Sequence, residues 1–453
     1  MTSILLQDDY QCRFVEKNYS SLLKFWKRRY MEMMSKTNSN IMYLYILRVI
    51  MYIFPLLTLP ILLRRLGIEN YGVISLIQAV SNYFILLVNY GFNFTGSRDV
   101  AKYSHDSNKL NEIFNNILFT KLFIVIVSSP VVIILGLLIP TLRENFTSFL
   151  LIFVVILNEV FFPIFLYQGM ENMKMITFLN LLSRVIGLIF ISIFVRDKND
   201  LFLAIVIINL STFLGGFIGL LIALKKYSLK IRLIKFSNII YELRNGWNLF
   251  IAQGMTAMFS NSSILILGII LSPKMVGYYS VAEKIMRMAA SFVSPISNAM
   301  YPVVVKKFVH SSQEAFKFIG HYFIFGTLIF GIGGVFLFSF SDLIITIFNG
   351  EKTVQMSNNL RILSFIPLSI FINNIYGTQI QLQISREKSF RNIILFCGLL
   401  LPLLTVLFVN INSNYGAAFA LLISEVLLTI LMVFDVEKTC KTGFFKFVFE
   451  RKV

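Results

Sequence analysis

Residues that build metal centres and nucleotide sites are scarce in this chain. Its three cysteines, Cys12, Cys397 and Cys440, are too few and too scattered for a disulfide framework or a thiolate metal site. The three histidines are isolated from one another, which argues against a metal role. No Gly-Lys dipeptide occurs, so the chain has no P-loop and ATP-driven transport by this chain alone is disfavoured. We therefore expect no metal and no bound cofactor.

Charged residues are also rare, at 14% of 453 residues, whereas a soluble domain has about 25%. Hydrophobic residues make up 57% of the chain and the mean hydropathy is +0.75. A water-soluble fold cannot bury so much apolar side chain, because it also needs a polar coat. The composition therefore predicts an all-α polytopic membrane protein with lipid as its solvent.

Acidic residues are fewer than basic ones, 23 against 41, which gives a net charge of +18. In a soluble protein this excess would suggest nucleic acid, but the hydropathy excludes a soluble nucleic-acid binder. Basic cytoplasmic loops explain the same excess in a membrane protein. The position of the charges decides between these interpretations.

Twelve stretches are long and apolar enough to cross a bilayer of about 30 Å, which takes about 20 residues per helix. They are 41–63, 70–94, 116–139, 148–168, 176–195, 201–224, 246–272, 277–305, 319–340, 358–382, 392–411 and 416–437.

The Lys and Arg residues outside these spans are divided unequally between the two sides. With the N-terminus inside, 28 lie on the inner side and 7 on the outer side. This bias predicts that both termini are cytoplasmic.

The basic inner loop 225–245 falls between the sixth and seventh spans, where a linker between two lobes would lie. We expect an N-lobe of six helices at 41–224, a C-lobe of six helices at 246–437 and a cytoplasmic tail at 438–453. Residues 1–40 form an expected cytoplasmic leader without the apolar core of a signal peptide. Three methionines at 31, 33 and 34 offer an alternative start.

A shift of 205 residues aligns the second span with the eighth and indicates an internal repeat. The shift places Gly72 on Gly277 and Ser75 on Ser280. Polar residues of the two spans then share a register on one face of each helix. Six spans per half is an even number, so the two halves should form a parallel repeat.

Both polar faces are expected to line a shared, water-accessible cavity between the lobes, because exposing unpaired polar groups to hydrocarbon costs free energy. Hydrogen bonding inside a packed bundle is the alternative. The expected lining residues are Gln78, Asn82, Asn89, Asn93, Ser291, Ser294 and Asn298.

Basic residues within spans are candidates for binding an anion, because charge at mid-membrane is costly. Arg48, Lys284 and Arg287 are the candidate ligands for a diphosphate, with ion pairing inside the fold as the alternative. Arg184 also lies deep. Lys121 lies near a span end, so we expect its amine to reach the interface.

Three acidic residues lie deep within spans: Glu159, Glu283 and Glu425. Each is a candidate to carry a coupling H⁺, or to bind Na⁺, although Glu283 is also placed to pair with Arg287 four residues later.

Three stretches carry a resemblance to a known family. They are LLRRLGIENYG at 62–72, YGFNFTGSRDVA at 90–101, and YSVAEKI at 279–285 with PISNAMYP at 295–302. With the two-lobe layout, the chain resembles the O-antigen (Wzx-type) flippases, the polysaccharide-export branch of the multidrug/oligosaccharidyl-lipid/polysaccharide exporter superfamily. The resemblance covers about residues 34–440, so it adds weight to the later start.

The resemblance implies a MATE-like, V-shaped pair of lobes around a central cavity in the bacterial inner membrane. It implies flipping of undecaprenyl-diphosphate-linked sugar units from the cytoplasmic to the periplasmic leaflet, and no enzyme activity. Arg48, Lys284 and Arg287 match positions where such families place basic cavity residues. A polysaccharide polymerase and a chain-length regulator are then candidate protein partners, beside the membrane lipids.

Two other functions stay open. A cation-coupled drug exporter of the same fold would use acidic residues in the cavity, whereas the first span here carries Arg48. A membrane glycan polymerase would need a large outward loop, and the longest outer loop here is only 341–357.

Overall fold

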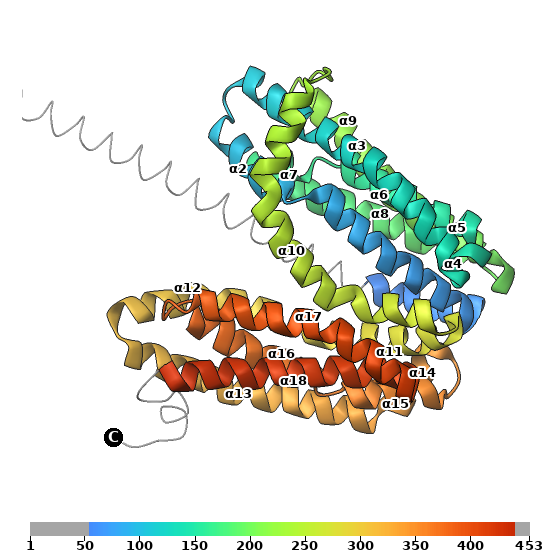
Figure 1. Ribbon diagram of the computed structural model, residues 1–453, viewed down its shortest axis with the longest axis vertical. Coiled ribbons are helices and arrows are strands. Elements are labelled where there is room, and N and C mark those ends of the chain that lie inside the picture. The colour runs from blue at the N-terminus through green and yellow to red at the C-terminus, as the bar shows by residue number, and fades with distance from the viewer. Residues whose placement is uncertain (1–53, 440–453) are drawn as a thin grey trace, which may run out of the picture.

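The computed structural model describes residues 54–439, apart from the side chains of 255–260. This part of the chain is helical and contains no strand. Figure 1 shows two bundles of helices that meet at one end and diverge toward the other. The N-lobe holds the helical segment 54–89 and α2 (Phe92–Lys102), α3 (Ser107–Leu138), α4 (Pro140–Glu144), α5 (Phe146–Leu150), α6 (Ile152–Phe161), α7 (Ile164–Gly169), α8 (Met173–Phe194), η1 (Lys198–Asp200) and α9 (Leu201–Lys226).

The C-lobe is built from the remaining helices, and α10 connects it to the N-lobe. These helices are α10 (Phe236–Ile270), α11 (Pro273–Ser291), α12 (Val293–His310), α13 (Ser312–Ser339), α14 (Ser341–Asn349), α15 (Val354–Leu363), α16 (Ile366–Asn373), the π-helical η2 (Asn374–Gln381), α17 (Glu387–Asn412) and α18 (Asn414–Thr439).

Ten helices of the described part are long and apolar enough to cross a membrane, which agrees with the expected all-α polytopic fold. The expected first two spans count as one here, because Phe54–Lys102 runs on as nearly continuous helix. Gly67 turns this helix at the boundary between the two spans, with a φ of 78° that glycine adopts without strain. The second half of α10 is a shorter apolar helix at Asn261–Ile270.

Helix α10 contacts both lobes along its length (Figure 1). Its first half packs on the N-lobe, where Phe250 stacks on Tyr90 with ring centroids 4.5 Å apart. Its later part packs against α17 of the C-lobe. One helix therefore ties the two bundles together.

The lobes touch where α11 begins, at the end that also carries α4 and α14. Gly72 packs against the backbone of Pro273, and Gly277 packs against the backbone of Ile68. Beside this contact, Arg64 Nη2 donates a 2.6 Å hydrogen bond to the carbonyl of Ile347 at the end of α14. We call this region the closed end.

Candidate functional site

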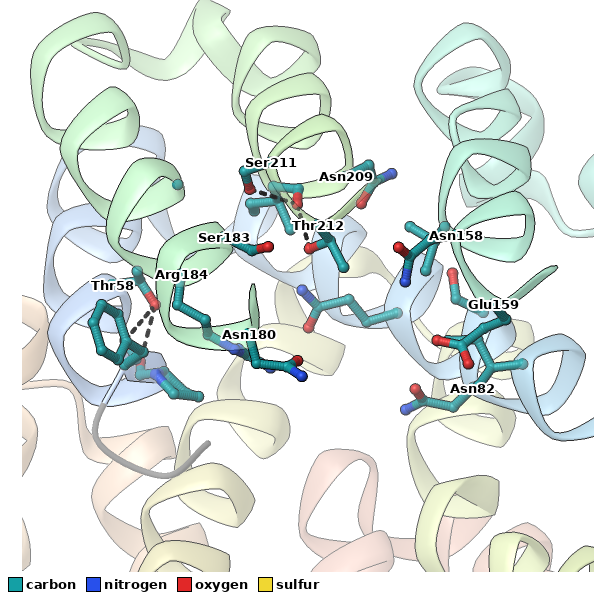
Figure 2. A pocket seen from close by; sticks show the side chains of 18 of the residues that line it. Thr58, Asn82, Asn158, Glu159, Asn180, Ser183, Arg184, Asn209, Ser211 and Thr212 are labelled. Atoms are coloured by element: carbon teal, nitrogen blue, oxygen red, sulfur yellow. Dashed lines mark hydrogen bonds between the residues drawn. The ribbon is translucent and has the colours of Figure 1, made fainter. Parts of the chain in front are cut away.

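A cavity of about 660 Å³ lies in the N-lobe, and its lining also includes the C-lobe residue Lys284. This volume is within the range of about 300–1,000 Å³ that is usual for small-molecule sites. Its lining side chains come from the segment 54–89 and from α2, α6, α7, α8, α9 and α11. Figure 2 shows polar side chains from several of these helices turned toward the same space.

Helical periodicity explains why each helix supplies several lining residues. On α8, Asn180, Ser183, Arg184 and Gly187 are spaced by three or four positions and so share one face. The same spacing places Gln78, Ser81, Asn82 and Ile85 on one face of the second span. Polar residues at this spacing turn toward the cavity while apolar neighbours meet lipid or the core.

Two cationic side chains line the cavity among the described residues. Lys284 reaches in from α11, and its Nζ donates a 3.1 Å hydrogen bond to Tyr71 Oη. The same Nζ lies 5.5 Å from the centroid of the Tyr71 ring, a favourable cation–π distance. Arg184 comes from α8, on the side of the cavity opposite Glu159 (Figure 2). Both are suited to bind an anion, Arg by a planar fork and Lys as a point charge.

Glu159 lines the cavity as the end of a buried polar chain. Its Oε2 accepts a 2.9 Å hydrogen bond from Asn89 Nδ2. Asn89 Oδ1 in turn accepts from Lys121 Nζ at 3.0 Å, and the same amine donates to the backbone carbonyl of Glu159 at 2.8 Å. Lys121 is 1% exposed, so the expectation that its amine reaches the interface is wrong: carbonyl and amide oxygens satisfy it inside the lobe.

The predicted N-lobe face is divided between the cavity and this buried chain. Gln78, Asn82 and Asn93 line the cavity, whereas Asn89 lies behind the wall. Asn82 Nδ2 also donates to Asn261 Oδ1 on α10, at 3.0 Å.

The polar face predicted for the C-lobe does not line this cavity. Arg287 pairs with Glu283, with Nη2 2.6 Å from Oε1, and neither lines this cavity. Ser291 donates to the carbonyl of Met288 at 2.6 Å, and Ser294 and Asn298 on α12 also lie outside the lining. The roles predicted for these residues stay predictions.

Two predicted residues remain to be placed. Glu425 on α18 is 5% exposed and its Oε2 accepts a 3.0 Å hydrogen bond from Asn373 Nδ2, so it is buried within the C-lobe. Arg48 lies outside the described residues. Within residues 54–439, no three His, Cys, Asp or Glu side chains gather as a metal site.

Several lining residues were not predicted from the sequence. They include Asn158 beside Glu159, Asn180 one turn before Arg184, and the pair Asn209 and Thr212 on α9. Amides at three- or four-residue spacing from a buried charge are the signal that could have identified Asn180. The remaining residues depend on how the helices pack.

Comparison with known proteins gives consistent matches. A model of the family described as "Polysaccharide biosynthesis protein" matches residues 38–308. A protein of Escherichia coli (strain K12) is 29% identical over 87% of this chain and 95% of its own length. A protein of Shigella dysenteriae is 24% identical over 87% of this chain and 98% of its own. Both are named, provisionally, O-antigen transporters.

Solved structures share the fold. An inward-facing multidrug resistance MATE transporter of the MOP superfamily has a TM-score of 0.63 at 15% identity, covering 89% of this chain and 99% of its own. The lipid II flippase MurJ in an inward closed conformation also has a TM-score of 0.63, at 13% identity, covering 90% of this chain and 89% of its own. These matches confirm the expected MATE-like fold.

Proposed function

Because the chain belongs to the polysaccharide biosynthesis protein family, we propose that it flips polyprenyl-diphosphate-linked oligosaccharides across the bacterial inner membrane. The carrier lipid is undecaprenyl diphosphate, and the sugar unit moves from the cytoplasmic to the periplasmic leaflet. The O-antigen transporters similar to this chain along nearly its whole length support transport rather than enzyme chemistry.

The observation that carries this proposal is that two cationic side chains, Arg184 and Lys284, line one polar, membrane-embedded cavity. A diphosphate diester carries two negative charges, and these two cations match it in number. The wall otherwise consists mainly of amides, hydroxyls and apolar side chains, which suits the hydroxyls and ring faces of sugars. Arg48 stays a predicted third cation, whereas Arg287 is held by Glu283.

Alternating access is supported by the two lobes meeting at one end only (Figure 1). The positive-inside bias assigns the closed end to the periplasmic side and both termini to the cytoplasm. The structure then corresponds to an inward-open state that loads substrate from the cytoplasmic leaflet. Rocking of the lobes about α10 would close the inner end and open the outer one.

Coupling to H⁺ or Na⁺ is proposed to use Glu159 or Glu425. Glu159 is in the cavity wall, so an ion that enters with or against the substrate reaches it directly. Glu425 is buried beside Asn373, where a proton would remove the cost of a buried charge. Glu283 is the weaker candidate because Arg287 already neutralises it. A polysaccharide polymerase and a chain-length regulator remain proposed partners that use the flipped product.

A deletion strain tests the proposal. Without the gene, lipid-linked sugar units should accumulate on the cytoplasmic side, and plasmid-borne wild-type protein should restore periplasmic units. Lys284→Ala protein at equal abundance should restore few. Unchanged periplasmic units and polymer in the deletion strain would refute the proposal, and loss of drug resistance instead would favour the drug exporter.

A further inference from the structure

Hydroxyl side chains of the cavity wall share one hydrogen-bonding arrangement. Five Ser and Thr residues line the cavity, and each donates its O–H to a backbone carbonyl of its own helix at 2.7–3.2 Å: Thr58, Ser81, Ser183, Ser211 and Thr212. A hydroxyl has a single proton, so once it is donated only lone pairs remain to meet a ligand. These five groups therefore act as acceptors.

Two amide side chains of the wall each commit one of their two N–H donors in the same way. Asn180 Nδ2 donates to the carbonyl of Ile176 at 2.9 Å, and Asn209 Nδ2 donates to that of Leu151 at 3.0 Å. Within the described lining of this cavity, the carbonyl oxygens of Asn93 and Asn158 are buried without any hydrogen-bond partner. Asn158 is 4% exposed, and its Oδ1 packs against Gly216 of α9.

The charged side chains of the cavity wall are also arranged unequally, with acceptor groups on one side and Arg184 on the other. Asn158, Glu159 and Asn82 lie on the side of the cavity opposite Arg184 (Figure 2). The carboxylate of Glu159 on this side attracts donors and repels anions. In the described lining, Arg184 and Lys284 are the cations, and a diphosphate would occupy both. A second acidic group on the ligand would then face these acceptors, with no further cation in the part of the lining that the structure describes.

We propose that this wall selects the sugar unit by its hydrogen-bond donors, and that the protein transports neutral or amino sugars and rejects acidic ones. The inference rests on the proposed function and adds the substrate class. Sugar hydroxyls and ammonium groups donate to the wall, whereas the carboxylate of a uronic acid is an acceptor only. Rejection comes from unpaired acceptors and like charge, the way a polar site excludes a wrong partner.

The test uses the full-length protein in proteoliposomes and two probes of equal size. Both are polyprenyl-diphosphate-linked disaccharides, one neutral and one with a terminal uronic acid. The wild type should flip the neutral probe about tenfold faster or more. Thr212 is exposed to the cavity, so Thr212→Lys adds a donor and should reduce that preference to about threefold or less. Gly331→Ala, at a position where a Cβ meets nothing within 4 Å, is the control and should keep the preference.

The outcomes separate the two proposals. Equal or faster flipping of the acidic probe by the wild type would overturn the donor rule while leaving the flippase function intact. If neither probe is flipped, the flippase proposal fails, and protection of the detergent-solubilised protein from thermal unfolding then decides the selectivity. Stronger protection by the neutral probe supports the donor rule, and equal or stronger protection by the acidic probe refutes it.

Discussion

Gly72 and Gly277 each abut the other lobe at the closed end, in a reciprocal contact. A Cβ on Gly72 would clash with the backbone carbonyl of Pro273, and a Cβ on Gly277 would clash with that of Ile68. The 205-residue shift that relates Gly72 to Gly277 also relates Ile68 to Pro273. The repeat read from the sequence is therefore the symmetry by which the lobes meet.

Replacing Gly72 by Ala should force the lobes apart at this end, because the obstructing atoms are backbone and cannot rotate away. We expect the population to shift toward the outward-open state. Spin labels on cysteines replacing the exposed Glu144 and Glu351, in a cysteine-free background, would report longer and broader distances. Gly331→Ala is the matched control, since a Cβ there meets nothing within 4 Å. An unchanged distance distribution in Gly72→Ala would contradict this account.

Arg64 and Arg65 are neighbours with different expected effects. Arg64 donates to the C-lobe carbonyl of Ile347, whereas Arg65 Nη1 donates to the backbone carbonyl of Ser192 in the N-lobe at 2.6 Å. Arg64→Ala should favour opening of the closed end by about 1 kcal/mol, roughly a fivefold change in population, with little loss of stability. Arg65→Ala should instead lower the melting temperature without changing the label distances. The same response from both variants would show that Arg64 does not hold the lobes together.

The Glu283–Arg287 pair can be separated from a ligand site by a double substitution. Glu283 is 3% exposed, so Arg287→Gln leaves a buried carboxylate unpaired and should cost about 3–5 kcal/mol of stability. Glu283→Gln together with Arg287→Gln removes both charges and should recover most of that loss. Recovered stability with normal flipping indicates structural pairing. If stability returns and flipping does not, Arg287 binds substrate as the sequence predicted.

Glu242 should make stability depend on pH. It lies before the membrane span of α10, and burial raises the pKa of its carboxyl to about 7, helped by the nearby charges of Asp99 and Glu112. The folded protein therefore binds this proton more tightly than the unfolded chain, whose pKa has the ordinary value of 4.5. The free energy of unfolding should fall as pH rises from about 4.5 through 7, by about 3 kcal/mol in total.

Thermal unfolding in detergent between pH 5 and 8.5 measures this dependence. Glu242→Gln should flatten the profile and raise the melting temperature at pH 8. The exposed Glu314→Gln serves as the control and should leave the profile as it is. A Glu242→Gln profile as steep as the wild type would contradict the assignment.

Prediction from the sequence works where apolar length and periodicity alone decide the structure. The sixth span was expected at 201–224, and α9 runs over Leu201–Lys226. The faces of single helices also carry over, since Gln78, Asn82 and Asn93 line the cavity. What a face meets is set by packing between helices, which no local pattern encodes.

Lys121 and Glu283 show that limit. Nothing in the sequence near Lys121 indicates that Asn89 and the carbonyl of Glu159 converge on its amine. Glu283 and Arg287 could be recognised as a pair from their spacing, but not that this pair would lie outside the cavity. The amides on α6 and α9 were missed for the same reason.

Flipping by the purified protein tests the central claim most directly. Proteoliposomes would carry a fluorescent polyprenyl-diphosphate-linked oligosaccharide, and a membrane-impermeant quencher would report its leaflet. The account predicts rapid exchange between leaflets with wild-type and Gly331→Ala protein, and at least about tenfold slower exchange with Arg184→Ala or Lys284→Ala. No exchange above protein-free liposomes, or equal rates in all four proteins, would contradict it.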